Sequence, residues 1–188
     1  MSICSSNLTK DTTPRALFKN KKSNEFEGIE LIESISSLVE ETIKRNKAKK
    51  KFSKKSVFFS EDSKIPDISI YNYIYNIYSL LNLEISSVLL SLISIKRLLE
   101  KTKDQLSKNN FYKLFITSCV LNSKQNEDLN YDYDIYSAVG KITKKELILL
   151  EQNYFQMIDY KLFVKEEIYN RYYDFIKNKA KKTNEKGL

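Results

Sequence analysis

The chain has 188 residues, of which 41% are hydrophobic and 30% charged, and its formal net charge is +8. This length and composition suit one folded domain with tails and exclude a chain that is disordered throughout. With no histidine and only three glycines, well separated along the chain, the sequence lacks a Ser-His-Asp triad, imidazole metal ligands and a phosphate-binding loop. We expect an all-α fold, because the three glycines and two prolines are too few for a turn-rich β fold.

The N-terminal part of the chain predicts a polar arm, one helix and a basic connection. Residues 1–23 are polar and are expected to be disordered. Residues 24–46 are expected to form an N-terminal helix, since apolar side chains recur there at helical spacing. Residues 47–64 are predicted to be a basic linker, in which the apolar segment 57–59 packs back onto the core.

The next part of the chain, residues 65–163, predicts five helices in succession. The apolar spacing, together with capping residues such as Ser107 and the Thr143–Glu146 capping box, places them at about residues 68–83, 84–99, 111–124, 131–138 and 143–158. The third of these, from Phe111 to Lys124, is apolar on nearly every side and has Lys113 as its only charge before Lys124. A helix of this kind is expected in the middle of the domain, surrounded by the others.

A C-terminal helix at residues 164–178 and a basic tail at 179–188 complete the predicted organisation. The helix is amphipathic, and the side chains expected to face inward are Ile168, Tyr172, Phe175 and Ile176.

The positive charge is concentrated outside the predicted helical domain. Residues 44–55 carry eight cations and no anion, and residues 177–186 carry five cations and one anion, so the rest of the chain has a net charge of −4. The basic linker is expected to be a solvated connector, with a nuclear-import signal or a contact to an acidic partner, nucleic acid or a membrane surface as alternatives.

The expected location is inside the cell, in the nucleus, the cytoplasm or both. The N-terminus has no basic start followed by an apolar run, as a secretory signal would, and the longest uncharged apolar segment, residues 85–95, is too short to cross a bilayer. Cys119 is expected to be a small buried hydrophobic side chain in a reducing setting.

The ordered motifs resemble a cyclin box, specifically that of the single-box P/U-type cyclins, over about residues 26–176. The strongest part is the run from Lys124 to Leu162, KQNEDLNYDYDIYSAVGKITKKELILLEQNYFQMIDYKL. The positions that match the family's order are Lys124, Asp128, Tyr136, Val139, Gly140, Ile142, Glu146, Leu147, Leu150, Glu151, Phe155, Ile158, Asp159, Tyr160 and Leu162. Earlier, SIYNYIYNIYSLL and VLLSLISIKRL resemble the first two helices of the box.

The resemblance implies a five-helix cyclin box between an N-terminal and a C-terminal helix, and a regulatory subunit that binds and activates a cyclin-dependent protein kinase as a heterodimer. It also implies that Lys124 and Glu151 make the main polar contacts to the kinase. The apolar contact area would come from Leu121, Leu147, Phe155 and Tyr160. No catalytic residue, cofactor or metal is implied.

Several positions depart from the family pattern. Asn76 and Lys96 stand where the family has an internal arginine–aspartate pair, and both partners have changed together, so no lone buried charge is expected. Lys141 stands at the family's second glycine, and Asn122 replaces a small residue two positions before Lys124. Asn122 is therefore expected to loosen or re-aim the kinase interface.

Two other functions stay open. The chain could be a pseudo-cyclin scaffold that binds a kinase without activating it, or a cyclin-fold module that binds nucleic acid as some transcription factors do. The second is disfavoured, because the cations cluster in the linker and the tail while the rest of the chain is net acidic. An enzyme is the least favoured function, and no membrane partner is expected.

Overall fold

Helices make up the secondary structure of the part that the computed structural model describes, which is residues 25–47, 55–128 and 130–184. In chain order the elements are α2 (Glu25–Lys47), the 3-10 turn η1 (Asp62–Lys64), α3 (Ile70–Leu80), α4 (Ile85–Thr102), α5 (Lys108–Asn126), α6 (Tyr133–Gly140), α7 (Lys144–Met157) and α8 (Glu166–Asn184). These described ranges contain no β-strand, so the predicted all-α fold is confirmed.

The expected arm at residues 1–23, the middle of the expected linker and the end of the expected tail lie outside the described residues. The apolar segment after the linker is described, and Phe58 packs against the core as predicted, with 1% of its surface exposed and its ring edge-on to Tyr154. Val57 beside it is 37% exposed and does not share this role.

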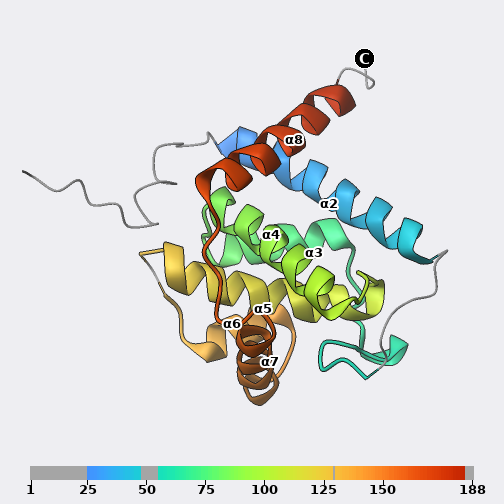
Figure 1. Ribbon diagram of the computed structural model, residues 1–188, viewed down its shortest axis with the longest axis vertical. Coiled ribbons are helices and arrows are strands. Elements are labelled where there is room, and N and C mark those ends of the chain that lie inside the picture. Colours follow the sequence, from blue (N-terminus) through green and yellow to red (C-terminus); the bar gives the residue numbers. More distant parts are fainter. Residues whose placement is uncertain (1–24, 48–54, 129, 185–188) are drawn as a thin grey trace, which may run out of the picture.

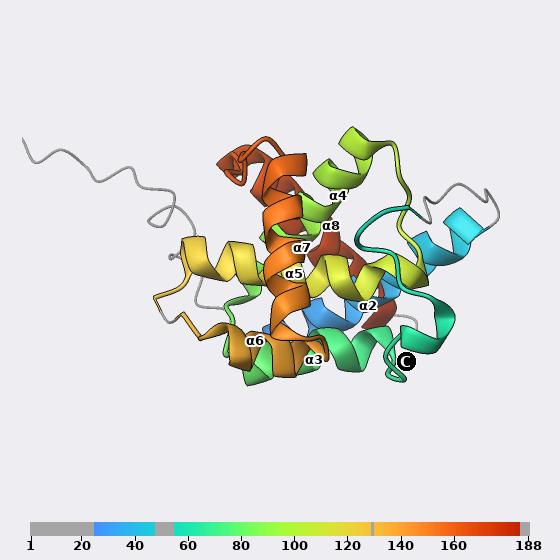
Figure 2. The same ribbon diagram turned by 90° about the horizontal axis from the view of Figure 1, so that it is seen from below.

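Helix α5 lies at the centre of the molecule, with α4 on one side and α7 crossing it on the other (Figures 1 and 2). Every residue of α5 from Asn110 to Ser123 is buried except Lys113. Lys113 reaches the Glu146 carboxylate at 2.9 Å, so the one charge within this run is neutralised at the edge of the core. The expectation of a central, all-round apolar helix is confirmed.

Local side-chain hydrogen bonds begin three of these helices. The Ser69 hydroxyl accepts the Asn72 N–H at the start of α3, and the Thr143 hydroxyl accepts the Glu146 N–H at the start of α7. The Asn110 side chain accepts the Ser107 N–H at the start of α5. The Glu146 carboxylate pairs with Lys113 across the α5–α7 contact, so it does not face back toward the N-terminus of its own helix as the predicted capping box requires.

Helices α2 and α8 lie against each other and cover α3 and α4 (Figure 1). The prediction for the inward face of α8 was partly wrong. Ile176 is buried, but Phe175 is 55% exposed, and the other side chains that α8 buries are Tyr169, Tyr173 and Ala180. Ile168 and Tyr172 of the predicted face are partly buried against the core, whereas the packing against α2 and α4 buries residues 169, 173, 176 and 180 more fully.

Helix α6 approaches α5 closely at Gly140. A Cβ atom at this position would lie 2.5 Å from Cγ1 of Ile116, a fully buried side chain of α5. The Gly140 carbonyl also accepts a hydrogen bond from the Tyr73 hydroxyl at 3.0 Å. The next residue, Lys141, ends α6 in the left-handed conformation with φ of 54°.

A small polar network crosses the core between α4, α5 and α7. The Tyr154 hydroxyl lies 2.9 Å from Oγ of Ser94 and 3.1 Å from Oγ of Ser118, which in turn donates to the Ser91 carbonyl. Cys119, next to Ser118, is fully buried as expected, and burial raises the pKa of its thiol to about 12.

Within the residues described, no helix is both long enough and apolar enough to cross a membrane. The same residues contain no group of three or more cysteine, aspartate or glutamate side chains placed to hold a metal ion.

Candidate functional site

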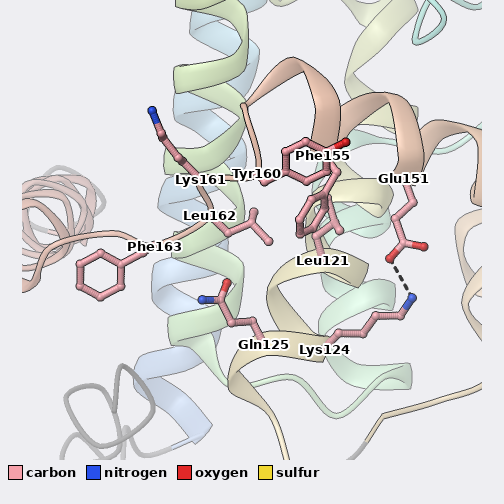
Figure 3. Close-up of a pocket in the computed structure, with 9 residues that line it drawn as sticks. All are labelled: Leu121, Lys124, Gln125, Glu151, Phe155, Tyr160, Lys161, Leu162 and Phe163. Carbon is pink, nitrogen blue, oxygen red and sulfur yellow. Dashed lines mark hydrogen bonds and ion pairs between the residues drawn. The ribbon is translucent and has the colours of Figure 1, made fainter. Parts of the chain in front are cut away.

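The last turn of α5 and the middle of α7 bring Lys124 and Glu151 together at the surface. Nζ of Lys124 lies 2.7 Å from a carboxylate oxygen of Glu151 (Figure 3). The Lys124 side chain is 32% exposed and that of Glu151 13%, so both charges are partly withdrawn from water. The two residues that the resemblance assigned to polar kinase contacts therefore form one half-buried ion pair.

Tyr133, at the start of α6, is a third member of this polar group. Its hydroxyl donates to the second carboxylate oxygen of Glu151 and accepts a hydrogen bond from Nζ of Lys124 at 2.8 Å. Burial opposes the positive charge of Lys124, but hydrogen bonds with Glu151 and Tyr133 outweigh it and raise its pKa. Burial, followed by the hydrogen bond to Glu151, also raises the pKa of Tyr133, so this tyrosine stays protonated at neutral pH.

An apolar cleft of about 690 Å³ opens beside the ion pair. Lys124 and Glu151 form one edge of the cleft, and its other lining residues are Leu121, Gln125, Phe155, Tyr160, Lys161, Leu162 and Phe163. In Figure 3 the side chains of Leu121, Phe155 and Leu162 point toward one another, while Phe163 points away. The cleft thus combines an apolar wall with one charged edge, a composition suited to a protein partner.

Three of the four predicted apolar site residues line this cleft, and the fourth does not. Leu121 forms part of the floor, Phe155 is half-buried, and Tyr160 is 67% exposed. Leu147 is 0% exposed and belongs to the core, so its assignment to a partner-contacting surface was wrong. Leu147 lies one turn before Glu151, and this spacing suggests that the two share a face of α7. In the structure the Leu147 side chain faces the core.

Asn122 also differs from its expected role. It is 1% exposed, and its amide donates to the Ser118 carbonyl at 2.8 Å inside α5. The backbone carbonyl of Asn122 also has a partner, because the side-chain amide of Asn126 donates to it at 2.8 Å. A side chain held in this way faces the interior, so it does not re-aim the surface beside Lys124.

The chain bends sharply where α7 leads into the far wall of the cleft. Asp159 and Tyr160 are both left-handed, with φ of 51° and 59°. This conformation is unfavourable for residues other than glycine, and a tyrosine adopts it rarely. An ion pair of 2.5 Å between Lys101 of α4 and Asp159 braces the bend, which presents the exposed Tyr160 ring 5.5 Å from that of Phe155.

The family's internal ion pair is replaced without leaving a buried charge, as expected. Lys96 lies at the surface of α4, where its ammonium is 3.3 Å from the Glu100 carboxylate and 57% of its side chain is exposed. Asn76 on α3 is half-buried and uncharged.

The sequence analysis missed Tyr133, Leu162 and Phe163 as members of this site. Tyr133 follows Lys124 after a loop, and its contact with Glu151 depends on how that loop folds, which helical spacing does not predict. Leu162 and Phe163 come after the left-handed bend at 159–160. The signal available for them was an apolar pair that follows the Asp159–Tyr160 couple after one lysine.

Comparisons with known proteins agree on one family. A family model described as Cyclin matches residues 5–162. Among curated proteins, cyclin-U2-1 of Arabidopsis thaliana is 28% identical over 147 residues, covering 76% of this chain and 65% of that protein.

Two further relatives match over shorter stretches. Cyclin-U4-3 of the same plant is 30% identical over 112 residues, covering 59% of this chain and 51% of its own length. Cyclin-P3-1 of Oryza sativa subsp. japonica is 29% identical over 107 residues, covering 57% and 45%. The chain thus spans less than two thirds of each of these three relatives.

Proposed function

Because this chain belongs to the cyclin family, we propose that it is a regulatory subunit that binds a cyclin-dependent protein kinase and activates it. The observation that carries the proposal is the half-buried Lys124–Glu151 pair at the edge of an apolar cleft. Cyclins regulate kinases and perform no chemistry of their own. The proposal places the protein inside the cell, in the nucleus, the cytoplasm or both.

The charged edge of the cleft is suited to hydrogen-bond a partner's main chain. Lys124 supplies N–H donors and Glu151 supplies acceptors, and at 2.7 Å each neutralises the other, which lowers the cost of covering both with a partner. Tyr133 fixes the carboxylate from the side facing away from the cleft. The pair would position the kinase's mobile regulatory helix.

The apolar wall supplies the area that holds the partner. Phe155 and Tyr160 offer two aromatic rings, which are the side chains that most often dominate binding energy at interfaces. The left-handed bend at Asp159 and Tyr160, with the Lys101–Asp159 ion pair beside it, directs the exposed Tyr160 ring toward Phe155 at the edge of the cleft.

The first test is charge reversal at Glu151. Glu151→Lys places a second cation beside Lys124, which repels it and removes the acceptors offered to the kinase. We expect binding to weaken at least tenfold, since breaking a half-buried hydrogen-bonded pair at an interface costs about 2–5 kcal/mol. Glu61→Lys reverses a carboxylate that is 73% exposed just before η1, and serves as the control with unchanged binding.

The kinase is first identified by affinity purification and mass spectrometry, and binding is then measured with the purified pair by calorimetry. Circular dichroism checks that the variants remain helical. Undiminished binding after changing Lys124 and Glu151 together would refute the interface. Kinase activity measured with and without the chain separates an activating subunit from a scaffold, which would bind without raising activity.

A further inference from the structure

Helix α8 carries two apolar stripes, of which one is buried in the domain and the other is only partly covered. The buried stripe consists of Tyr169, Tyr173, Ile176 and Ala180. The second consists of Ile168, Tyr172 and Phe175, spaced four and three residues apart, and it faces a groove along α4. Phe175 is 55% exposed, and Ile168 and Tyr172 are half-buried. Ile168 and Tyr172 rest on the core and leave one side uncovered, so together with Phe175 they offer a partly open apolar surface to another chain.

The groove between α4 and α8 has a volume of about 500 Å³. Its floor is Ile93 of α4, which is 2% exposed, and its α8 wall is the second stripe. Lys96 extends from α4 to within 5.4 Å of the centre of the Tyr172 ring, so the two walls meet at this point. The groove is separate from the cleft at Lys124. Arg97 lies between them, and its guanidinium donates to the Phe163 carbonyl at 2.8 Å.

The rim of the groove is positively charged. It carries Lys96, Arg97 and Arg171 against a single carboxylate, Glu100, which already pairs with Lys96. Arg171 is exposed and has no ion-pair partner within the described ranges. An arginine guanidinium is well matched to a carboxylate because it can donate two parallel hydrogen bonds.

We infer that the α4–α8 groove binds an acidic peptide segment of another protein, one that carries a bulky apolar side chain for the stripe and carboxylates for the rim. The two longest segments of the chain outside the described residues do not fit. Residues 1–24 carry five cations and one anion, and residues 48–54 carry four cations and no anion, so both would be repelled. The inference does not depend on the kinase proposal, because the two surfaces share no residue.

The test uses the full chain and a short fluorescein-labelled peptide rich in glutamate that contains leucine and phenylalanine. Fluorescence anisotropy should show saturable binding, and amide chemical shifts should change along residues 93–100 and 168–175. Arg171→Glu and Phe175→Ala alter only the exposed side of α8 and should each weaken binding about fivefold or more. Lys64→Glu and Leu80→Ala change an exposed cation and an exposed apolar side chain on η1 and α3, and should leave binding unchanged.

Three results would overturn the inference. One is the absence of saturable binding up to millimolar peptide. Another is evidence that the groove is only a general anion site. Equal binding by a peptide in which alanine replaces the leucine and phenylalanine would show this, and so would equal competition by heparin or by phosphatidylserine vesicles. The third is equal loss of binding in the Lys64→Glu and Leu80→Ala variants.

Discussion

Glu127 shows at the scale of one residue how this fold tolerates a carboxylate close to its core. Its side chain accepts the N–H of Glu84 at 2.9 Å, which satisfies a free donor at the start of α4. Burial nevertheless raises the pKa of Glu127 above its ordinary value of 4.5. The native state therefore holds this proton more tightly than the unfolded chain does. The contribution of Glu127 to stability is greatest at low pH and is lost as the pH rises through its native pKa.

We predict that Glu127→Gln stabilises the protein at pH 7. The substituted amide keeps an oxygen to accept the Glu84 N–H, but it has no charge to bury. The gain should be no more than about 1 kcal/mol, because the carboxylate keeps partial contact with water. It should shrink as the pH falls through the native pKa of Glu127, which lies above the ordinary value, because the parent carboxyl is then protonated as well.

Urea unfolding at several pH values measures this difference. Glu61→Gln, which changes an exposed carboxylate, should leave stability the same at each pH. A Glu127 variant less stable than its parent at pH 7 would mean that the charged hydrogen bond to Glu84 outweighs the cost of burial.

Sequence analysis identified the charged pair of the candidate site but not all of its surroundings. Lys124 and Glu151 were predictable because each sits at a fixed place in an ordered set of motifs. Tyr133 was not, because its contact with both depends on a loop. Leu147 was misassigned because position along α7 does not distinguish the core face from the surface face, whereas packing against α5 does.

At the scale of elements, the contact between α5 and α6 depends on a missing side chain. We predict that Gly140→Ala destabilises the protein by about 1–3 kcal/mol, because its Cβ would lie 2.5 Å from the fully buried Ile116. Gly28→Ala is the matched control. Its Cβ would lie 2.8 Å from the hydroxyl and 3.5 Å from Cζ of Tyr78, the far end of a long side chain rather than a branched one fixed in the core, and alanine favours the helix.

Thermal and urea unfolding of both variants measures the contrast. Gly28→Ala should change the free energy of unfolding by much less than Gly140→Ala does. Combining Gly140→Ala with Ile116→Ala should cost less than the sum of the two changes, since the smaller side chain makes room for the new methyl group. Strict additivity would mean that Ile116 is not what excludes a side chain at position 140.

The end of α6 offers a change in the opposite direction. Lys141 adopts a left-handed conformation with φ of 54°, which glycine accepts more readily than lysine. We predict that Lys141→Gly stabilises the protein by about 0.5–1 kcal/mol, the relief of strain being partly offset by the greater freedom of glycine in the unfolded chain. Gln152→Gly, at an exposed position inside α7, should instead destabilise it by about 1 kcal/mol. Urea unfolding distinguishes the two signs.

The helices themselves were largely predictable, and their orientation was less so. Apolar spacing and capping residues located α2 to α7 within a few residues. For α8 the spacing allowed two inward faces, and the predicted one shares only Ile176 with the face that is fully buried. The choice depends on what α2 and α4 present to the helix, which is a property of the assembled domain.

At the scale of the whole molecule, the distribution of charge separates the remaining functions. The excess of cations lies in residues 44–55 and 177–186, and the net charge of the remaining residues is −4. At the candidate kinase surface the charge of Lys124 is neutralised by Glu151. A partner held through that surface relies on apolar area and a neutralised pair. Its affinity should depend only weakly on salt.

We predict that kinase binding falls by less than about tenfold between about 50 mM and about 200 mM salt. Binding of a duplex DNA through many phosphate contacts would fall by about 10³–10⁵ over the same range. Calorimetry with the purified kinase and anisotropy with a labelled duplex compare the two directly. Tight duplex binding with a steep salt dependence, unaffected by Glu151→Lys, would favour the nucleic-acid function instead.

Because Cys119 is buried in the central helix α5, its reactivity can report whether the domain opens. A thiol with no exposed surface and a pKa of about 12 does not react with an alkylating reagent while α5 stays packed. The rate of Cys119 alkylation therefore reports how often the domain opens around its central helix. This rate, followed by peptide mass spectrometry with and without a bound partner, would report how much that partner holds the whole bundle closed.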